Sequence, residues 1–296
     1  MRKLLIVANP EAGNRKAAKV AASARSFFER QGLHCELQQT TATANAQKVV
    51  ETHLTSDITD LVVIGGDGTL NEAVNGISHP DVVVSIISSG TGNDFIKNIE
   101  IGNTLEEQFQ TVLDGQVFSI DLGLCNERKF LNGVGIGFDG QIVRDMLHRK
   151  TWLTGHAAYY YHVLRILASY QERDFTFRLD EQPYQEKLIL MTIGNGTTFG
   201  GGFKLTPHAI LNDGLLDVCC IGAIGAFRRF LNVPRLSNGS HGKLPEVDFH
   251  QAKSVQISDN PLLEGHIDGE YLGKPPFRIS IAPNKLKIRA RGFTAP

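Results

Sequence analysis

The stretch LVVIGGDGTLNE at residues 61–72 constrains the fold of this chain more than any other. Its apolar, β-branched start predicts a buried strand, and the pattern after Gly68 predicts a helix. The glycines between them allow a sharp turn and leave room for a ligand. Thr69 and Glu72 have the spacing of a capping box, which would fix where the helix begins. The stretch therefore predicts a strand–turn–helix unit of an α/β fold.

The same turn has the chemistry of a phosphate site. Backbone amides at a glycine turn, and at the start of the helix that follows, present positive partial charge to an anion. Asp67 is the exception, because a carboxylate repels phosphate unless a metal ion or water lies between them. The turn therefore indicates nucleotide phosphates together with a divalent cation.

Length and charge exclude several classes of protein. The 296 residues are enough for two domains. With 30 basic and 31 acidic residues the net charge is −1, which argues against broad nucleic-acid binding. No apolar run is long enough for a membrane span or a secretory signal, so we expect a cytoplasmic protein that meets a membrane only peripherally, at its inner face. The cysteines lack metal-type spacing and are expected to be reduced core thiols, at Cys35, Cys125, Cys219 and Cys220.

Strand and helix patterns alternate in the first part of the chain. Strands are predicted at 3–8, 34–40, 61–64 and 82–88, with helices at 15–31, 44–54, after Gly68 and at 104–115. The last helix starts with a second capping box, Thr104 to Glu107. This alternation predicts a parallel sheet with helices on its faces, over residues 1–120.

The pattern changes from about residue 117. Strand-like segments joined by turns dominate, with two helical pieces near 138–150 and 156–170. This favours a mostly antiparallel β-sandwich domain over residues 121–285, packed closely against the first domain.

Three glycine-rich loops follow strands of the first domain, at 9–13, 65–69 and 89–94. Each alone is more often a simple chain reversal, but open α/β sheets bind ligands at the carboxyl ends of strands, and three loops at one edge could surround a nucleotide. The chain has no P-loop motif and no GxGxxG after its first strand. The loops offer neutral polar side chains instead: Asn9, Thr40, Thr69, Thr91 and Asn93.

At these loops the chain resembles the diacylglycerol kinase catalytic-domain family of lipid kinases, which includes bacterial diacylglycerol kinases and sphingosine and ceramide kinases. GGDGT alone also occurs in NAD kinases and phosphofructokinases, so the combination carries the resemblance. The matching segments are NPEAG, VVIGGDGTLNEAVNG, SGTGNDF, IDLG, NGVGIGFDG, GGGFKLTPHAILNDGLLDV and HIDGEYL.

The resemblance implies ATP in the cleft between an α/β domain and a β-sandwich domain, with the C-terminal segment 286–296 returning to the first domain. Thr40 is preferred to Thr41 by its six-residue step to Ala46. The implied nucleotide contacts are Asn9, Pro10, Gly13, Thr40, Gly65, Gly66, Asp67, Gly68, Thr69, Asn71, Thr91 and Asn93.

HIDGEYL places Asp268 and Glu270 around a glycine, which could be an ordinary β-turn. In phosphoryl transfer, a positioned carboxylate can accept the proton of the attacking hydroxyl. The resemblance assigns that role to Glu270, and the holding of catalytic Mg²⁺ to Asp268, Asp67 and Asp121, partly through water.

A second acidic segment, 209–218, reads as an Asn-Asp-Gly hairpin turn. The resemblance offers a structural Mg²⁺ site there, made by the Asp213 side chain with the backbone carbonyls of Ile210 and Leu215. Most histidines are expected at the surface or in turns, and His266 beside the DGE turn is the one of interest.

The lipid acceptor site is less legible. Basic and aromatic residues combine in 144–170, with Arg144, His148, Arg149, Lys150 and Trp152, and again in 226–236. Such stretches can contact an anionic membrane, but an ordinary core helix with a solvated end is the alternative.

Together these observations predict an ATP- and Mg²⁺-dependent lipid kinase of phospholipid metabolism. Diacylglycerol, phosphatidylglycerol, a sphingoid base and a prenyl alcohol all stay open as acceptors, as does a homodimer. One alternative is a soluble-substrate kinase of the NAD kinase type. The other is a non-catalytic paralogue that binds ATP without transferring phosphate.

Overall fold

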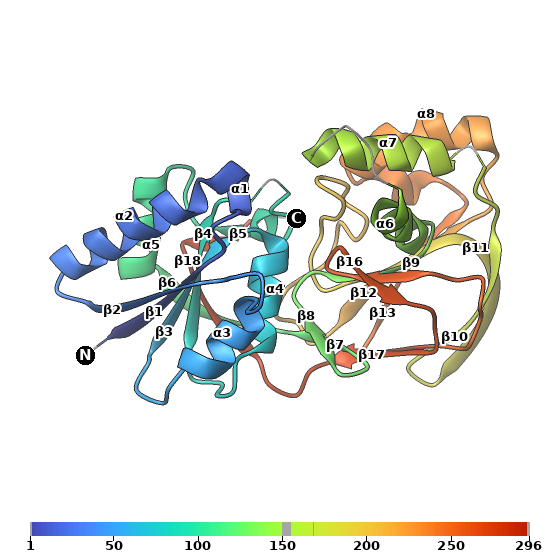
Figure 1. Ribbon diagram of the computed structural model, residues 1–296. Helices are drawn as coiled ribbons and strands as arrows, with labels where there is room; N and C mark the ends of the chain where they lie inside the picture. The colour runs from blue at the N-terminus through green and yellow to red at the C-terminus, as the bar shows by residue number, and fades with distance from the viewer. Residues whose placement is uncertain (1, 91, 150–154, 168, 295–296) are drawn as a thin grey trace. The chain divides into compact units, whose positions relative to one another are not determined.

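The computed structural model describes residues 2–90, 92–149, 155–167 and 169–294 (Figure 1). These form two compact units. Unit 1 runs up to Ile120 and includes the segment that begins at Pro283, and unit 2 runs from Asp121 to Ala282. Lys150 and Trp152, two of the basic and aromatic residues singled out above, lie outside the described residues.

Unit 1 is built on a six-stranded sheet in the order β2-β1-β3-β4-β18-β6. All neighbours pair in parallel except β18 and β6, which are antiparallel. The predicted α/β domain with a parallel sheet is therefore confirmed. The strands are β1 (Lys3–Ala8), β2 (His34–Gln39), β3 (Asp60–Gly65), β4 (Val83–Ser88), β6 (Gln116–Ile120) and β18 (Leu286–Ala290), with a separate pair β5 (Ile99–Glu100) and β19 (Gly292–Phe293).

Helices cover both faces of this sheet. On one face α2 and α5 bury Phe28 and Phe109 against β1 and β3, and α3 and α4 contact each other elsewhere in the unit. The helices are α1 (Ala12–Arg15), α2 (Ala17–Arg30), α3 (Ala46–His53), α4 (Asp67–Asn75), α5 (Leu105–Asp114) and the 3₁₀ turn η1 (Phe95–Asn98).

The two predicted capping boxes have opposite outcomes. The box of Thr104 and Glu107 is present at the start of α5 and is confirmed. The box of Thr69 and Glu72 is wrong, because α4 begins earlier, at Asp67, after an extended Gly66. The Glu72 carboxylate instead accepts the backbone N–H of Ala46 at 2.9 Å, and so satisfies the first turn of α3.

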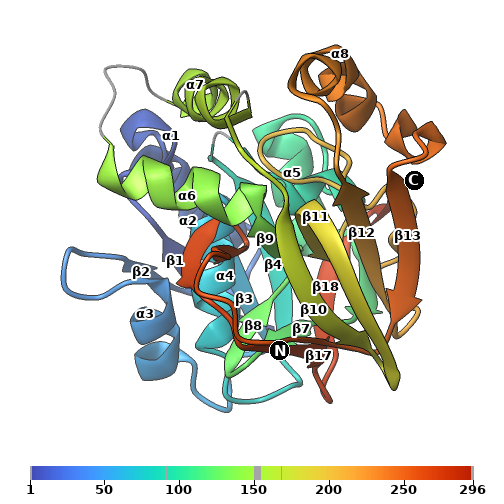
Figure 2. The ribbon, with the colours of Figure 1, turned by 90° about the vertical axis from the view of Figure 1, so that its right-hand side faces the viewer.

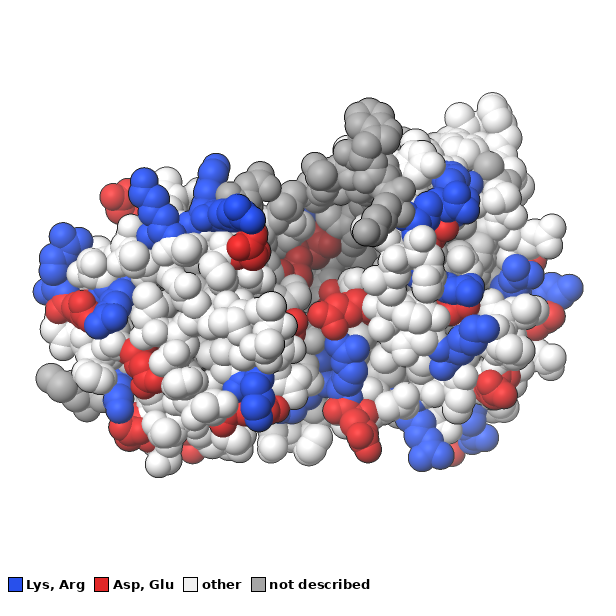
Figure 3. All heavy atoms as spheres, in the orientation of Figure 1, with Lys and Arg blue, Asp and Glu red and all other residues white. Residues whose placement is uncertain are grey.

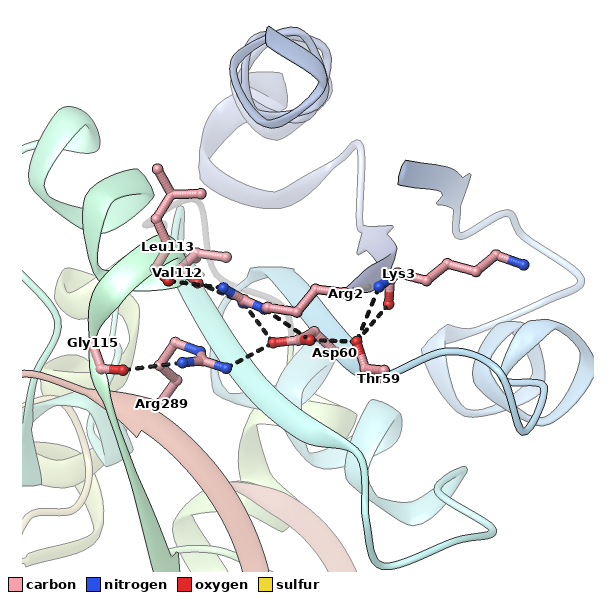
Figure 4. A network of polar contacts seen from close by, with 8 residues as sticks. All are labelled: Arg2, Lys3, Thr59, Asp60, Val112, Leu113, Gly115 and Arg289. Carbon is pink, nitrogen blue, oxygen red and sulfur yellow. Dashed lines mark hydrogen bonds and ion pairs between the residues drawn. The ribbon is translucent and has the colours of Figure 1, made fainter. Parts of the chain in front are cut away.

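A largely buried ion-pair network surrounds Asp60 at the start of β3 (Figure 4). Asp60, the first residue of β3, accepts from the guanidinium groups of Arg2 and Arg289 at 2.6 and 3.0 Å. Burial alone would raise the Asp60 pKa, but the hydrogen bonds from Arg2 and Thr59 hold it below its usual value. Arg2 also donates to the last carbonyls of α5, at Val112. The network ties together strands from the two ends of the chain.

Unit 2 is an antiparallel, β-rich domain, as predicted, whose strands join in one large sheet around an apolar core of four phenylalanines and many aliphatic side chains. The phenylalanines are Phe130, Phe175, Phe177 and Phe277. The strands are β7 (Gly123–Cys125), β8 (Arg128–Phe130), β9 (Gly133–Gly137), β10 (Arg173–Leu179), β11 (Gln182–Gly194), β12 (Leu216–Gly222), β13 (Val247–Ala252), β14 (Ser254–Ile257), β15 (Gly265–Ile267), β16 (Glu270–Gly273) and β17 (Phe277–Ile281).

Helices α6 (Phe138–His148) and α7 (Gly155–Leu167) match the two predicted helical pieces, but the expectation of only two is wrong. A third helix, α8 (Ala226–Ser237), has no fully buried residue and carries Pro234 within it. A 3₁₀ turn, η2 (Ser240–Lys243), follows it. All four cysteines are free and buried, as expected. Among the described residues, no helix has the length and apolar character needed to cross a membrane.

Candidate functional site

The three glycine-rich loops of unit 1 follow β1, β3 and β4, which are neighbours in the sheet, and they pack directly on one another. A Cβ atom built on Gly13 would lie 2.1 Å from the carbonyl oxygen of Ser89, and one on Gly90 would lie 2.5 Å from the Cα of Gly66. Gly13 also has a φ of +60°. Only glycine fits such close approach, so these residues hold the three loops together.

Polar side chains link the same loops. The Asn9 amide donates to the Thr69 hydroxyl at 3.4 Å, and the Asn93 amide donates to the Ser88 hydroxyl at 2.7 Å and the Gly90 carbonyl at 2.9 Å. Among the described residues, the side-chain amide oxygen of Asn93 and the hydroxyl of Ser89 are buried without a hydrogen-bond partner. Buried polar groups normally have partners, so this edge fits a polar ligand. Sequence reasoning did not select Ser89.

Asp67 is held by the neighbouring loop rather than left free. Its two carboxylate oxygens accept the backbone N–H groups of Asp94 at 2.9 Å and Phe95 at 3.2 Å. Burial raises the Asp67 pKa, and these two hydrogen bonds oppose the shift. The carboxylate therefore joins the loops at 65–69 and 89–94.

The remaining residues expected to contact nucleotide have varied surroundings. The N–H of Thr40 donates to the Ala8 carbonyl at 2.9 Å, next to the end of β1, whereas the Thr41 hydroxyl is engaged in its own turn with Ala44. Asn71 is buried within α4 and Gly68 lies in its first turn. Pro10 follows β1 and is half-buried, and Thr91 lies outside the described residues.

In unit 2, Asp268 and Gly269 form the two-residue turn of the hairpin between β15 and β16. Both have positive φ, +45° and +84°, as a type I′ hairpin turn requires. The Asp268 carboxylate accepts three backbone N–H groups at 2.8–3.0 Å, from Leu131, Asn132 and Gly133. The segment at 268–270 is therefore an ordinary hairpin turn that also holds the two acidic residues of the motif.

Glu270 is held differently. Its carboxylate accepts from the Arg128 guanidinium of β8 at 2.7 Å, and both side chains are about 40% exposed. On the buried side of the turn, His266 Nδ1 lies 3.4 Å from the N–H of Gly269, and burial lowers the His266 pKa to about 4. His266 is thus a neutral, buried neighbour of the turn. His162 and His241 are buried as well, whereas the other histidines whose side chains are described are exposed or half-buried, as expected for most of them.

Asp121 lies beside the Asn-Asp-Gly turn of residues 209–218. Its backbone N–H donates to Leu211, and its carboxylate accepts the N–H of Gly214 at 2.7 Å. Asp213 is exposed and accepts the N–H of Leu215 at 3.0 Å, and the Ile210 side chain is also exposed. The described residues contain no cluster of three acidic, histidine or cysteine side chains placed to hold a metal ion.

Two further buried acids escaped sequence reasoning. Asp217 lies in β12, shortly after Asp213 in the sequence. Burial raises the pKa of Asp217 to about 6, with a smaller contribution from the Asp213 charge. Asp139 lies in the first turn of α6 and accepts from the Thr192 hydroxyl at 3.2 Å, and burial raises its pKa to about 6. Asp139 follows the strand β9 and Asp217 lies near the start of β12, but neither position distinguishes these residues from surface acids in the sequence.

The structure therefore gathers the candidate residues into two sets. Unit 1 holds the glycine edge with Asp67. Unit 2 holds Glu270 and Asp268 at one hairpin, and Asp121 with Asp213 at the other turn. The resemblance had placed Asp121 with the catalytic acids. Its carboxylate accepts from Gly214 of the 209–218 turn, and its backbone carbonyl accepts from the Asn195 amide at 3.0 Å.

Comparison with known proteins defines the class to which this two-unit chain is similar. Residues 3–125 match the model of the diacylglycerol kinase catalytic domain. Residues 132–290 match that of the YegS C-terminal NAD kinase beta sandwich-like domain. The chain belongs to the diacylglycerol kinase catalytic-domain family, with a C-terminal domain of the YegS type.

Named relatives agree with this assignment. A diacylglycerol kinase of Staphylococcus epidermidis is 29% identical over 273 residues, which span 92% of this chain and 86% of that protein. One from Staphylococcus carnosus is 28% identical, over 92% and 89%. These relatives support an enzyme of the kinase class.

Solved structures from Bacillus anthracis str. Sterne share the fold. One superposes with a TM-score of 0.77 at 22% identity, and it covers 98% of this chain and 97% of its own. Another, of a diacylglycerol kinase, gives a TM-score of 0.74 at 23% identity, over 98% and 96%.

Proposed function

We propose that this protein transfers the γ-phosphate of ATP to the hydroxyl of a lipid, with diacylglycerol as the first candidate acceptor. The observation that carries the proposal is the glycine-packed edge of unit 1, where three loops meet with backbone spacing that a side chain would destroy. The relatives named diacylglycerol kinase supply the acceptor class.

In the proposed reaction, unit 1 binds the nucleotide. The loops at 9–13, 65–69 and 89–94 present backbone amides near the start of α4, which suits phosphate oxygens. The unpartnered oxygen of Asn93 and hydroxyl of Ser89 are available for polar groups of the nucleotide or for water. Asn9 and Thr69, already joined, fix the loop after β1 against α4.

The donor set fits Mg²⁺, which prefers oxygen ligands and keeps several waters. Asp67 is a carboxylate that burial makes harder to ionise, so a nearby cation would favour its charged form. When bound with ATP, the ion would neutralise charge on the phosphates. At the other turn, the Asp213 side chain with the carbonyls of Ile210 and Leu215 would hold a structural ion, and Asp217 lies close enough to feel the Asp213 charge.

Glu270 would accept the proton of the lipid hydroxyl as it attacks the γ-phosphorus. Its side chain is half-exposed, so a substrate can reach it, and Arg128 orients its carboxylate. Asp268 would act by fixing the turn through its three amide hydrogen bonds, in addition to any contact with the ion through water. We propose a cytoplasmic enzyme that works peripherally at the membrane, in phospholipid metabolism.

A phosphorylation screen tests this function. Purified protein is incubated with γ-labelled ATP, Mg²⁺ and single lipids dispersed in detergent, and label is counted in the organic phase after subtraction of ATP hydrolysis. Diacylglycerol should be labelled, and magnesium chelation should abolish labelling. Label that enters only water-soluble acceptors would favour the NAD kinase type of reaction. ATP binding with no transfer to any acceptor would favour a non-catalytic paralogue.

A further inference from the structure

Helices α7 and α8 carry apolar side chains on the faces that point away from the protein. In α7 the apolar positions described as exposed are Ala157, Tyr160, Tyr161 and Leu164, which are spaced i, i+3, i+4, i+7. In α8 the same spacing gives Phe227, Phe230, Leu231 and Pro234, all exposed. A helical stripe with this period normally faces a core. Here the ring of Tyr160 contacts Phe203 at 5.8 Å between centroids, yet all the residues of both stripes are exposed.

The opposite faces of both helices are already used inside unit 2. Val163, Ile166 and Leu167 of α7 are buried in one apolar cluster, against which Val233 and Leu236 of α8 pack. The helices contact each other and lie side by side in both ribbon views (Figure 2). Because their inner faces share one cluster, the outer stripes are directed away from it, on one side of unit 2.

The apolar side chains of this outer surface are strongly exposed. Six residues define the surface, which we call the α7–α8 face, with the exposed fraction of each: Phe227 76%, Leu231 61%, Leu164 51%, Tyr160 41%, Tyr161 41% and Phe230 39%. In the space-filling view, the corner occupied by α8 is mainly white, with Lys and Arg gathered below it (Figure 3). Exposed apolar patches of this kind mark interaction sites.

Charge selects the occupant. Neither α7 nor α8 contains an Asp or Glu, whereas Arg165, Arg228, Arg229 and Arg235 lie on them. Arg165 and Arg228 pair with acids of neighbouring elements, and Arg235 is exposed. Lys204, whose N–H donates to Leu236, and Lys243 of η2 add basic groups at the end of α8. Protruding Phe, Leu and Tyr beside Arg and Lys suit an anionic bilayer surface, where rings insert and cations meet headgroups.

We propose that the α7–α8 face is the surface by which this protein docks on anionic lipid bilayers. The two stretches that the sequence offered as separate membrane contacts form one surface in the fold. The inference deepens the proposed function, because it names where the kinase meets the phase that contains its acceptor. Docking itself requires no catalytic turnover.

Vesicle sedimentation tests the inference. The full chain is mixed with vesicles of phosphatidylcholine alone, or of phosphatidylcholine with phosphatidylglycerol, and the bound fraction is measured at low and high salt. We expect binding to the mixed vesicles that weakens at high salt. Phe227→Ser/Leu231→Ser should lower the partition coefficient by about tenfold or more. Arg235→Gln should weaken binding to the vesicles that contain phosphatidylglycerol and leave binding to phosphatidylcholine vesicles unchanged.

Leu262→Ser is the matched control, since Leu262 also lies in unit 2 and is also 61% exposed, but lies outside α7 and α8. It should bind vesicles as the wild type does. Wild-type protein that binds no anionic vesicles would overturn the inference, as would equal losses in Leu262→Ser and the double variant. It would also be overturned by a dimer in gel filtration that the double variant dissociates, since the face would then hold a second copy.

Two further results separate this inference from the proposed function. Vesicle binding without phosphorylation of any lipid would remove the kinase proposal and leave the docking face. Phosphorylation of detergent-dispersed lipid without vesicle binding would remove the docking face and leave the kinase proposal.

Discussion

The acids of the two candidate regions are held by different kinds of group. Asp67 in the glycine edge and Asp268 in the hairpin are held by backbone amides, two in the first case and three in the second. Glu270 is held by one flexible side chain, that of Arg128. Amides fixed in loops cannot move away without local unfolding, whereas an arginine can rotate. The comparison separates acids that build the turns from the acid that is free to exchange partners.

This difference agrees with the roles we propose. A general base must lose its resting partner when substrate arrives, and Glu270 is the acid for which that is easy. Asp67 and Asp268 keep their amides and can only add a water or ion on their remaining lone pairs. If the type of partner separates the two roles, substitution of Glu270 should mainly lower activity, and substitution of Asp268 should mainly lower stability.

The largest effect is expected for Glu270→Gln. Glutamine keeps a hydrogen bond to Arg128 but cannot accept a proton, so lipid phosphorylation should fall by about 10²- to 10⁴-fold. ATP binding and the thermal midpoint should be unchanged. The matched control is Glu181→Gln, which removes another carboxylate that pairs with an arginine, Arg178, at a hairpin of the same unit. Equal loss in both variants, or full activity in Glu270→Gln, would remove the assignment of the base.

Asp67→Ala should produce the next largest effect. It removes the carboxylate proposed to hold Mg²⁺ and leaves the N–H groups of Asp94 and Phe95 without their acceptor. We expect the Mg²⁺ concentration for half-maximal activity to rise by about 10- to 100-fold. Titration of activity with Mg²⁺ at saturating ATP measures it. An unchanged magnesium curve with lower activity would mean that Asp67 only joins the two loops.

Asp268→Ala should destabilise the protein more than Glu270→Gln does. Three N–H groups lose their acceptor, which costs roughly 1–3 kcal/mol even with partial hydration. Asp268→Asn keeps one acceptor oxygen and should lie between the alanine variant and wild type. Urea denaturation of the three proteins measures the order. A stability equal to wild type in Asp268→Ala would show that the amides contribute nothing to holding the turn.

The sequence was most informative where local chemistry decides structure. Strand, glycine turn and helix at residues 60–75 follow from β-branched residues, glycine and the helical pattern, and the family follows from those motifs. The failures involve partners distant in sequence. Glu72 could cap its own helix or reach Ala46, and only the packing of α3 against α4 decides between them. Asp268 and its three amides are likewise more than 130 residues apart.

Helix α8 shows a different limit. Sequence patterns identify helices by one apolar face, and α8 has apolar residues on two sides, with Arg229 and Pro234 among them. Arg229 donates to the carbonyls of Ile224 and Leu167, so a charged side chain occupies part of the inner face. The pattern becomes readable only when the neighbouring helix is known.

Asp139→Asn should have the smallest effect, and it extends the comparison to an acid held by neither amides nor arginine. Burial raises its pKa to about 6, against an ordinary value of 3.8, and the Thr192 hydroxyl is its described partner. With a raised folded-state pKa, its contribution to stability is fully present below pH 4 and is lost as the pH rises through 6. Asparagine cannot ionise, so the variant should gain on wild type over that interval. The difference in thermal midpoint should become more positive between pH 4.5 and 7.5, by roughly 2–4 °C for each kcal/mol.

The difference between the two proteins is the quantity to measure, because other groups also titrate in this range. His266, with its pKa lowered to about 4, makes both proteins less stable as the pH falls from about 6.5 toward 4, and this contribution cancels in the difference. A midpoint difference that stays constant from pH 4.5 to 7.5 would mean that Asp139 ionises in the folded protein as easily as in the unfolded chain. The hydroxyl of Thr192 would then serve a buried carboxylate as well as backbone amides do, and the division by type of partner would not extend to Asp139.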